Sequence, residues 1–496
     1  MSFKFNKSIA YFVFSIFTIL ISQFFVSFLP LQIPDFRKYL VICIFLILFF
    51  ILYTIEYKKM DKLSYIAFIT IFLFGIIFSL IKPVQFGLDE ESHFLSTIKL
   101  SDSGIFINQN EAYPDFDKVN VSFDILRHPN EYKGEENFYT IEHQKSNISG
   151  KIVGINNLSF LPSAIGWKLG AIISKKIYIS YFLGRIFNCL FYAILAALAI
   201  KISRNYKKVL FFISTLPFAT YICASYQYDS LYFGLSLLII SLILNFYNES
   251  KSVGIKEICI FTLMCFLFAF TKIPFILLGL LIVILPSESY KHASCRIYAG
   301  VAFIFELLLS FGYLILVHIS HTSANIGGTQ GIVYFIKHPF PIIRTLIDFL
   351  FISMNSISNP LQYIIAESRF MSTCFTIIFV VTIIFLSVNL DIKMKNYFTV
   401  TLFFLLFIIT LLIIYAISSD SRVFKYGDLF VNGVQGRYYY FMILVIPIYI
   451  SPALNKYIVN SSNNEINIVN YLLFSSLFLN IVTLGIAMYT VIPHVL

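Results

Sequence analysis

Residues 63–93 have the sequence LSYIAFITIFLFGIIFSLIKPVQFGLDEESH, and this stretch decides the class of the fold. Its first part is an apolar run of about twenty residues, the length that an α-helix needs to cross a hydrocarbon core of about 30 Å. The run is followed by an acidic cluster, Asp89-Glu90-Glu91-Ser92-His93. Carboxylates and an imidazole therefore stand where a membrane helix is expected to meet water.

The composition of the whole chain agrees with this reading. Of its 496 residues, 58% are hydrophobic and only 12% are charged, and the mean hydropathy is +0.82. A soluble domain usually has roughly a quarter of its residues charged. Because backbone groups in lipid must be satisfied internally, spanning segments are expected to be helices. The sequence thus predicts an all-α, polytopic membrane protein whose first apolar stretch, Tyr11–Leu29, is a retained helix without a cleavage site.

Lysine and arginine residues gather in short loops, which is a signal of topology in a membrane protein. Placing these loops inside predicts about thirteen spans, with the N-terminus in the cytoplasm. The apolar stretch 159–173 is taken as re-entrant or interfacial, because counting it as a span would invert every later loop. The predicted spans are 10–29, 38–55, 63–81, 177–200, 208–223, 230–246, 257–271, 273–286, 297–318, 371–388, 397–417, 437–453 and 468–489.

Two other classes of protein are disfavoured. The net charge of +10 does not indicate nucleic-acid binding, because the cations lie in the short loops between apolar runs. The seven cysteines have no CxxC spacing and lie mainly in predicted spans, so a disulfide framework or a cysteine zinc site is not expected.

Two polar segments interrupt the series of spans and define the domain organisation. We divide the chain into an N-terminal pair of helices, 1–62, and a transmembrane domain, 63–490. The domain includes a large outer loop, 82–158, after the third helix, and a second outer segment, 319–370. Long loops usually carry function or disorder. The second segment contains an amphipathic stretch that is expected to lie in the membrane interface.

The predicted topology brings four polar groups to one face. Asp89, Glu90 and His93 follow the third span; Tyr226, Tyr228 and Asp229 lie in the turn before 230–246; Lys272 lies between two later spans; and Gln435, Arg437 and Tyr438 begin the span 437–453. Acids, cations and tyrosines at one surface of a helix bundle are typical of a site for an anionic, lipid-linked substrate.

Each of these groups also has a simpler interpretation. Asp89 and Glu90 are suited to cap a helix and favour its dipole, and Glu90-x-x-His93 has the spacing of carboxylate metal sites without the second such motif. Lys272 is suited to extend from a helix end toward water. Arg437 beside Tyr438 fits an interfacial aromatic belt, or phosphate recognition by a planar guanidinium. For Arg185, inside a predicted span, pairing between helices is the expected role.

An ordered set of motifs resembles a known family. Pro83-Val84-Gln85 precedes Asp89-Glu90-x-x-His93, and Val434-Gln435-Gly436-Arg437-Tyr438 comes near the end of the chain. Between them lie Leu161-Pro162 to Gly166, Arg185 with Asn188, Leu216-Pro217 to Asp229, and Lys272-x-Pro274. Over roughly residues 63–490 this order resembles an uncharacterised family of bacterial polytopic membrane proteins related to glycosyltransferases of the GT-C fold.

The resemblance implies an inverting glycosyltransferase that moves a sugar from a polyprenyl-phosphate donor to an acceptor glycan or polymer on the outer face of the cytoplasmic membrane. Asp89 matches the catalytic acid of the first large outer loop, with Glu90 or His93 orienting it. Lys272 and Arg437 are expected to stabilise the leaving phosphate, and Asp229, Gln435 and Tyr438 to bind substrate. No cofactor or metal ligand is assigned, although a divalent metal is compatible with the reaction. The alternatives are a transporter or flippase, and a ligase or polymerase, of lipid-linked glycans.

Overall fold

The structure is a computed structural model of the chain. The predicted spans 10–29 and 38–55, which make up most of the N-terminal segment 1–62, lie outside the described residues. The described residues are 62–82, 84–104, 106–107, 113–122, 138–144, 152–153, 155–321, 332–358, 369–388, 390, 392, 394–418, 420, 423–425, 427–457 and 465–490.

Nearly all regular structure in the described part of the chain is helical. The first half contains α3 (Leu63–Ile81), α4 (Glu90–Ser103), β1 (Phe106–Ile107), α5 (Pro114–Ser122), β2 (Ile152–Val153), η2 (Ile155–Phe160), α7 (Leu161–Ile173), α8 (Ile177–Ile202), α9 (Lys207–Ser214), α10 (Pro217–Cys223) and α11 (Asp229–Asn248). The second half contains α12 (Ile255–Ala269), η3 (Ile273–Gly279), α13 (Leu280–Val283), η4 (Ser287–Ser289), α14 (Ala293–His321), α15 (Ile332–Lys337), α16 (Phe340–Ser358), α18 (Arg369–Val388), α19 (Asn396–Ser418), η5 (Gly436–Tyr439), α20 (Tyr440–Tyr457) and α21 (Glu465–Thr490).

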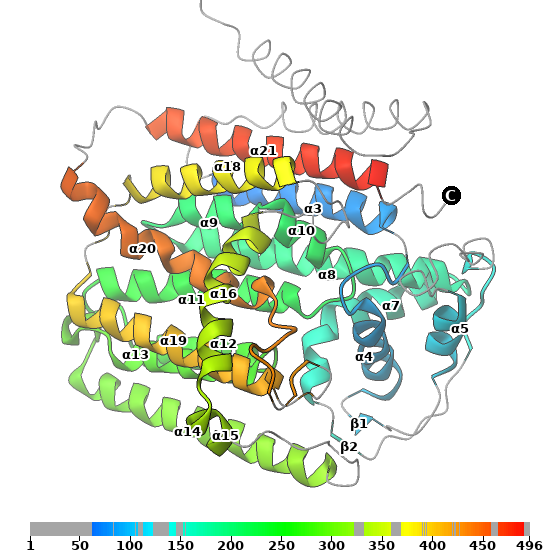
Figure 1. Cartoon of the computed structure of the whole chain (residues 1–496), viewed down its shortest axis with the longest axis horizontal. Coiled ribbons are helices and arrows are strands. Elements are labelled where there is room, and N and C mark those ends of the chain that lie inside the picture. Colours follow the sequence, from blue (N-terminus) through cyan, green and yellow to red (C-terminus); the bar gives the residue numbers. More distant parts are fainter. Residues whose placement is uncertain are drawn as a thin grey trace, which may run out of the picture.

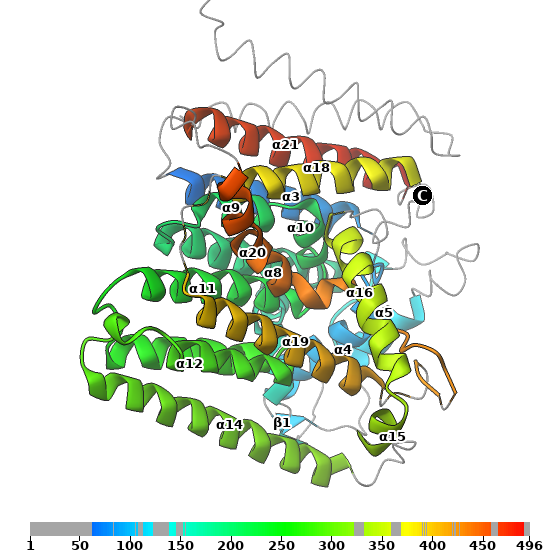
Figure 2. The same cartoon turned by 60° about the vertical axis from the view of Figure 1, so that its left-hand side comes forward.

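The long helices lie side by side in one bundle (Figures 1 and 2). The helices α18, α21 and α3 form one edge of the bundle, and α14 forms the opposite edge. The short elements α4, α5, β1 and β2 gather at one end, which we call the loop end (Figure 1). The prediction of a polytopic helical bundle is therefore confirmed.

Among the described residues, eight helices are long and apolar enough to cross a membrane. They are Leu63–Ile81, Ile177–Ile202, Asp229–Asn248, Ala293–Gly312, Phe370–Val388, Asn396–Ser418, Gly436–Asn455 and Ile468–Ala487. Each coincides with a predicted span, so the protein is a multi-pass membrane protein.

Three other predicted spans are shorter or broken in the structure. The segment 208–223 divides into α9 and α10, because Pro217 starts a new helix and cannot continue the preceding hydrogen-bond ladder. The α12 helix has 15 residues, fewer than a full crossing needs. The segment 273–286 contains the 3₁₀ helix η3, which has Pro274 in its first turn, and one turn of α-helix, α13.

The stretch 159–173 forms α7, which is 13 residues long and therefore too short to cross a bilayer. It packs against the first half of α8 through Gly166 and Gly170, one turn apart. A Cβ at Gly166 would lie 2.4 Å from the backbone oxygen of Leu183, and one at Gly170 would lie 2.3 Å from Cα of Ser180. Small residues at this spacing allow close helix packing in membranes, and this contact places the first turn of α7 beside the groups described below.

The loop end is tied to the bundle by a small sheet and a polar chain. The strands β1 and β2 pair antiparallel, with Phe106 opposite Val153. The ring of His143 lies 2.7 Å from Asp115 on α5 through Nδ1, and 2.7 Å from Ser180 on α8 through Nε2. Because Ser180 is fully buried beneath α7, this Asp-His-Ser chain joins elements and does not expose a nucleophile.

Candidate functional site

The acidic cluster begins α4 in an unusual backbone conformation. The turn from α3 to α4 contains two residues with positive φ, Gln85 at 57° and Asp89 at 55°. Residues other than glycine rarely adopt this backbone conformation, and backbone strain of this kind is frequent at functional sites. Asp89 occupies the N-cap position, but its side chain makes no capping hydrogen bond. The simple capping interpretation therefore does not account for the Asp89 carboxylate.

The neighbouring acid, Glu90, points into the bundle and is held by Arg185 on α8. Its two oxygens lie 2.8 Å from Nε and Nη2 of Arg185, in a bidentate ion pair with both side chains fully buried. The same oxygens also accept hydrogen bonds from the backbone N–H groups of Gly87 and Tyr226. Burial raises the pKa of Glu90, but the charge and hydrogen bonds of Arg185, together with the charge of Lys82 and the Gly87 N–H, outweigh this effect and lower the pKa overall.

This geometry revises the role that the sequence assigned to Glu90. A carboxylate whose oxygens accept four hydrogen bonds inside the protein is suited to positioning its neighbours, and we do not expect Glu90 to contact substrate. The expected pairing of Arg185 between elements is confirmed, and its partner is this acid.

Asp89 points the other way, to Arg437 at the start of η5. Nη2 of Arg437 donates to Asp89 at 2.8 Å, and Nη1 donates to Asp229 at 2.9 Å and to Gln227 at 3.1 Å. The side chains of Arg437 and Asp229 are buried, whereas that of Asp89 is 55% exposed. Arg437 thus joins the buried acid Asp229 to the exposed acid Asp89. Arg437 and Asp89 are 348 residues apart in the sequence.

A second cation, Lys272, lies beside this chain of ions. Its ammonium donates to the hydroxyl of Tyr228 at 3.2 Å and lies 3.6 Å from the ring centroid of Tyr438. Burial lowers the pKa of Lys272 to about 8, against the opposing effect of Asp229. The amine is therefore mainly charged at neutral pH, and a bound anion would favour the charged form further.

His93 contributes a ring and not an ion pair. The imidazole packs against Phe160 at 5.3 Å and Tyr228 at 5.1 Å between ring centroids. Burial lowers the pKa of His93, so it is expected to be neutral at pH 7. Its Nδ1 has no hydrogen-bond partner within the described part of the chain. The Glu90-x-x-His93 spacing does not form a metal site here, because Arg185 holds the Glu90 carboxylate.

Buried polar contacts hold the four converging segments in place. Asn188 on α8 donates to the carbonyl oxygens of Ser225 and Gln227 at 2.8 and 2.9 Å, which fixes the turn before Asp229. On the other side, the hydroxyl of Tyr232 donates to the carbonyl of Tyr438. The ring of Tyr232 stacks on Phe268 of α12 at 5.3 Å, so η5 is fixed against both α11 and α12.

Several polar atoms in the site have no partner among the described residues: Nε of Arg437, Oδ1 of Asp229 and Oε1 of Gln435. Buried polar groups without partners are uncommon and call for an explanation. Gln435 was predicted to bind substrate, and its buried side-chain oxygen is available for that role. Gln227 was not predicted, although it lies between the named residues Tyr226 and Asp229. Its contact with Arg437 is set by the tertiary fold.

The site lies at the loop end of a membrane bundle. It contains the acids Asp89 and Asp229, the cations Lys272 and Arg437, and the aromatic rings of Phe160, Tyr228 and Tyr438. The comparison with known proteins agrees with the membrane assignment and covers all four segments. A search of curated proteins and a search of solved structures each find no match. A family model matches residues 72–446, from within α3 to within α20, and the chain belongs to the family described as "Predicted membrane protein (DUF2142)".

Proposed function

We propose that the protein is an inverting membrane glycosyltransferase that moves a sugar from a polyprenyl-phosphate donor to an acceptor glycan on the outer face of the bacterial cytoplasmic membrane. The observation that carries the proposal is the position of Asp89. Its carboxylate is exposed, while the guanidinium that holds it is buried beneath it. A fixed, open carboxylate at the end of a membrane bundle suits a general base for a hydroxyl that arrives from water.

In the proposed step, Asp89 accepts the proton of the acceptor hydroxyl as its oxygen attacks the anomeric carbon. A bond forms between that oxygen and the anomeric carbon, and the bond from the anomeric carbon to the phosphate oxygen breaks with its electron pair. A single displacement inverts the configuration at the anomeric carbon. The products are the glycosylated acceptor, a protonated Asp89 and the polyprenyl phosphate.

The leaving phosphate gains a negative charge, which Lys272 is placed to stabilise. The charge of Arg437 is already shared by Asp89 and Asp229, whereas Lys272 has neutral aromatic neighbours, Tyr228 and Tyr438. Cations aimed at developing charge in a site shielded from water stabilise transition states strongly. We therefore assign the phosphate to Lys272 and assign the orientation of Asp89 to Arg437.

The roles of Asp229 and Gln435 follow from side-chain oxygens that have no hydrogen-bond partner among the described residues. Asp229 holds Arg437 with one oxygen, and its second oxygen has no partner in the described residues. Hydroxyl groups of the sugar are suitable donors to it and to Gln435. No group of three or more His, Cys, Asp or Glu side chains within the described residues is arranged to hold a metal ion.

The test is transfer by purified protein in proteoliposomes, with a panel of polyprenyl-phosphate sugars and acceptor glycans. Asp89→Asn should lower the rate by a factor of about 10²–10⁴, the usual contribution of a general base. Glu91→Gln is the matched control, because Glu91 is an exposed acid on the same first turn of α4, and it should keep nearly full activity. Full activity in Asp89→Asn would overturn the assignment of the base.

A further inference from the structure

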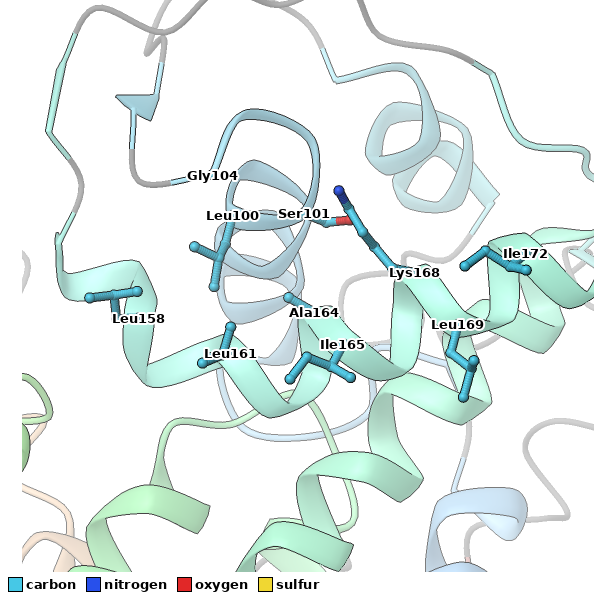
Figure 3. Close-up of a pocket in the computed structure, with 10 residues that line it drawn as sticks. All are labelled: Leu100, Ser101, Gly104, Leu158, Leu161, Ala164, Ile165, Lys168, Leu169 and Ile172. Carbon is cyan, nitrogen blue, oxygen red and sulfur yellow. The ribbon is translucent and has the colours of Figure 1, made fainter.

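Two apolar grooves flank the first turn of α7 and share Leu158, Leu161 and Ile165. The α4 groove, about 550 Å³, lies between α4 and α7 (Figure 3). The α8 groove, about 420 Å³, lies on the other side of α7. The α8 groove is lined by Leu158, Leu161, Pro162, Ile165, Phe187, Leu190, Phe191, Ile194, Leu231, Leu267 and Phe270.

Some residues that line the α8 groove are close in sequence to residues of the candidate site. Leu231 comes two residues after Asp229, and Phe270 comes two residues before Lys272. The chain residue that precedes Leu161 is Phe160, whose ring packs on His93. Two walls of the groove are thus continuous with the segments that carry Asp229 and Lys272, and the third wall follows the residue that packs on His93.

One end of the groove leads away from the loop end, along α8. The lining residues Phe187, Leu190, Phe191 and Ile194 extend over two turns of that helix, a distance of about 10 Å. Every lining residue is apolar, and Leu161, Ile165 and Ile194 are exposed on the surface of the bundle. An exposed apolar surface on a membrane bundle is suited to contact with lipid hydrocarbon.

The charge of Lys272 indicates which class of lipid the α8 groove would bind. Lys272 is the cation next to Phe270, and it has no carboxylate within ion-pair distance among the described residues. An apolar groove with a half-buried ammonium group two residues beyond one of its lining residues complements a single hydrocarbon chain with an anionic head. The α4 groove differs, because its lysine, Lys168, is exposed and no residue of α11 or α12 lines it. Figure 3 shows Lys168 extending toward α4.

We propose that the α8 groove binds the hydrocarbon chain of the lipid that carries the donor sugar, with the phosphate of that lipid at Lys272. The chain enters between α7, α8 and α12 and extends toward the middle of the membrane along α8. This proposal rests on the proposed function for the sugar, but the binding of the lipid itself needs no transfer reaction.

The test is the binding of radiolabelled polyprenyl monophosphate to the full-length protein in phosphatidylcholine nanodiscs. Ile194→Trp fills the far end of the groove and should weaken binding about tenfold, because the indole ring occupies space that the hydrocarbon chain needs. Lys272→Met should weaken binding at least as much, by removing the partner of the phosphate. Ile172→Trp in the α4 groove and Ile304→Trp on α14 are matched controls at exposed isoleucines, and both should bind like the unmodified protein.

A second measurement avoids any effect of the tryptophans on folding. A photoreactive benzoylphenylalanine in place of Phe191 should crosslink to the labelled polyprenyl monophosphate, and the same group at Ile172 should not. Unchanged binding in Ile194→Trp together with no crosslink at position 191 would overturn the groove. Equal competition by a two-chain phosphatidylglycerol would show that ordinary bilayer lipid occupies it, which also overturns the proposal.

The two proposals fail in different ways. If polyprenyl monophosphate binds in the groove but no sugar is transferred from any donor in the panel, the proposed function fails and the lipid site stands. If transfer depends on Asp89 but the groove variants bind normally, the lipid site fails and the proposed function stands.

Discussion

Two buried arginines bind two adjacent acids in this protein, and they differ in what remains available to a ligand. Arg185 directs all five of its N–H groups at acceptors: Glu90, the carbonyl oxygens of Ser79 and Lys82, and the hydroxyl of Tyr181. Arg437 binds Asp89, Asp229 and Gln227, and its Nε has no acceptor in the part of the chain that the structure describes. We call Arg185 and Glu90 the closed pair, because every N–H of the guanidinium has an acceptor. We call Arg437 and Asp89 the open pair, because one N–H has none among the described residues.

The exposure of the acids follows the same division. The Glu90 side chain is fully buried, whereas that of Asp89 is 55% exposed. A buried carboxylate with four donors is suited to holding a turn in place, and an exposed one on a buried guanidinium is suited to contacting a ligand. Adjacent residues of one motif therefore have different roles: Glu90 stabilises the turn from which Asp89 projects.

The largest expected effect comes from breaking the closed pair. Arg185→Met removes the ion-pair partner of the buried Glu90, and Glu90→Gln removes that of Arg185, so each should cost about 3–5 kcal/mol of stability. The double variant Glu90→Gln/Arg185→Met should lose less than the sum of the single losses, because neither charge is then left alone. The measurement is the unfolding temperature of the purified protein in detergent. Additive losses would contradict a direct pair.

The second prediction compares the same substitution at the two arginines. Arg437→Lys keeps a positive charge but loses the planar guanidinium that donates to both Asp89 and Asp229. The rate of sugar transfer should therefore fall by a factor of about 10² or more. Arg185→Lys loses more hydrogen bonds and should lower the unfolding temperature further than Arg437→Lys does. Transfer and unfolding are both measured for each variant. If Arg437→Lys lowers stability more and transfer less than Arg185→Lys, the division into an open and a closed pair is wrong.

Much of the bundle was predictable because the length of an apolar run limits what it can form. The segments 63–81, 230–246 and 468–489 were predicted as spans and correspond to α3, α11 and α21. Local composition determines whether such a run forms a spanning helix. The break at Pro217 was not predicted, because a proline inside an apolar run ends a helix only where neighbouring elements satisfy the freed backbone groups.

The members of the site were predictable from topology, but their pairing was not. Polar residues that follow spans on one face must converge at one end of a bundle, and Asp89, Asp229 and Arg437 do so. The choice of partner depends on the left-handed conformation of Asp89, which directs its side chain away from that of Glu90. Backbone strain of this kind depends on the surrounding tertiary structure and has no signal in the sequence of an aspartate.

The third prediction concerns pH and tests whether Lys272 acts as a cation in the open site. Because burial lowers the pKa of Lys272 to about 8, its charge is present below that pH and is lost above it. The ratio kcat/KM for the donor should therefore fall as the pH rises through about 8. Lys272→Arg stays charged at all these pH values, so its fall should move to higher pH. An identical alkaline limb in both proteins would exclude Lys272 as its cause.

The smallest expected effect comes from the aromatic face beneath Lys272. The ammonium lies 3.6 Å from the ring centroid of Tyr438, and such a contact contributes about 0.5–2 kcal/mol. Tyr438→Leu should lower kcat/KM for the donor several-fold, because it loosens the cation that stabilises the leaving phosphate without removing it. Tyr438→Phe keeps the ring and should behave like the unmodified protein. If Tyr438→Phe is as impaired as Tyr438→Leu, the hydroxyl and not the ring is the functional group, and Tyr438 then belongs with the residues that contact the sugar.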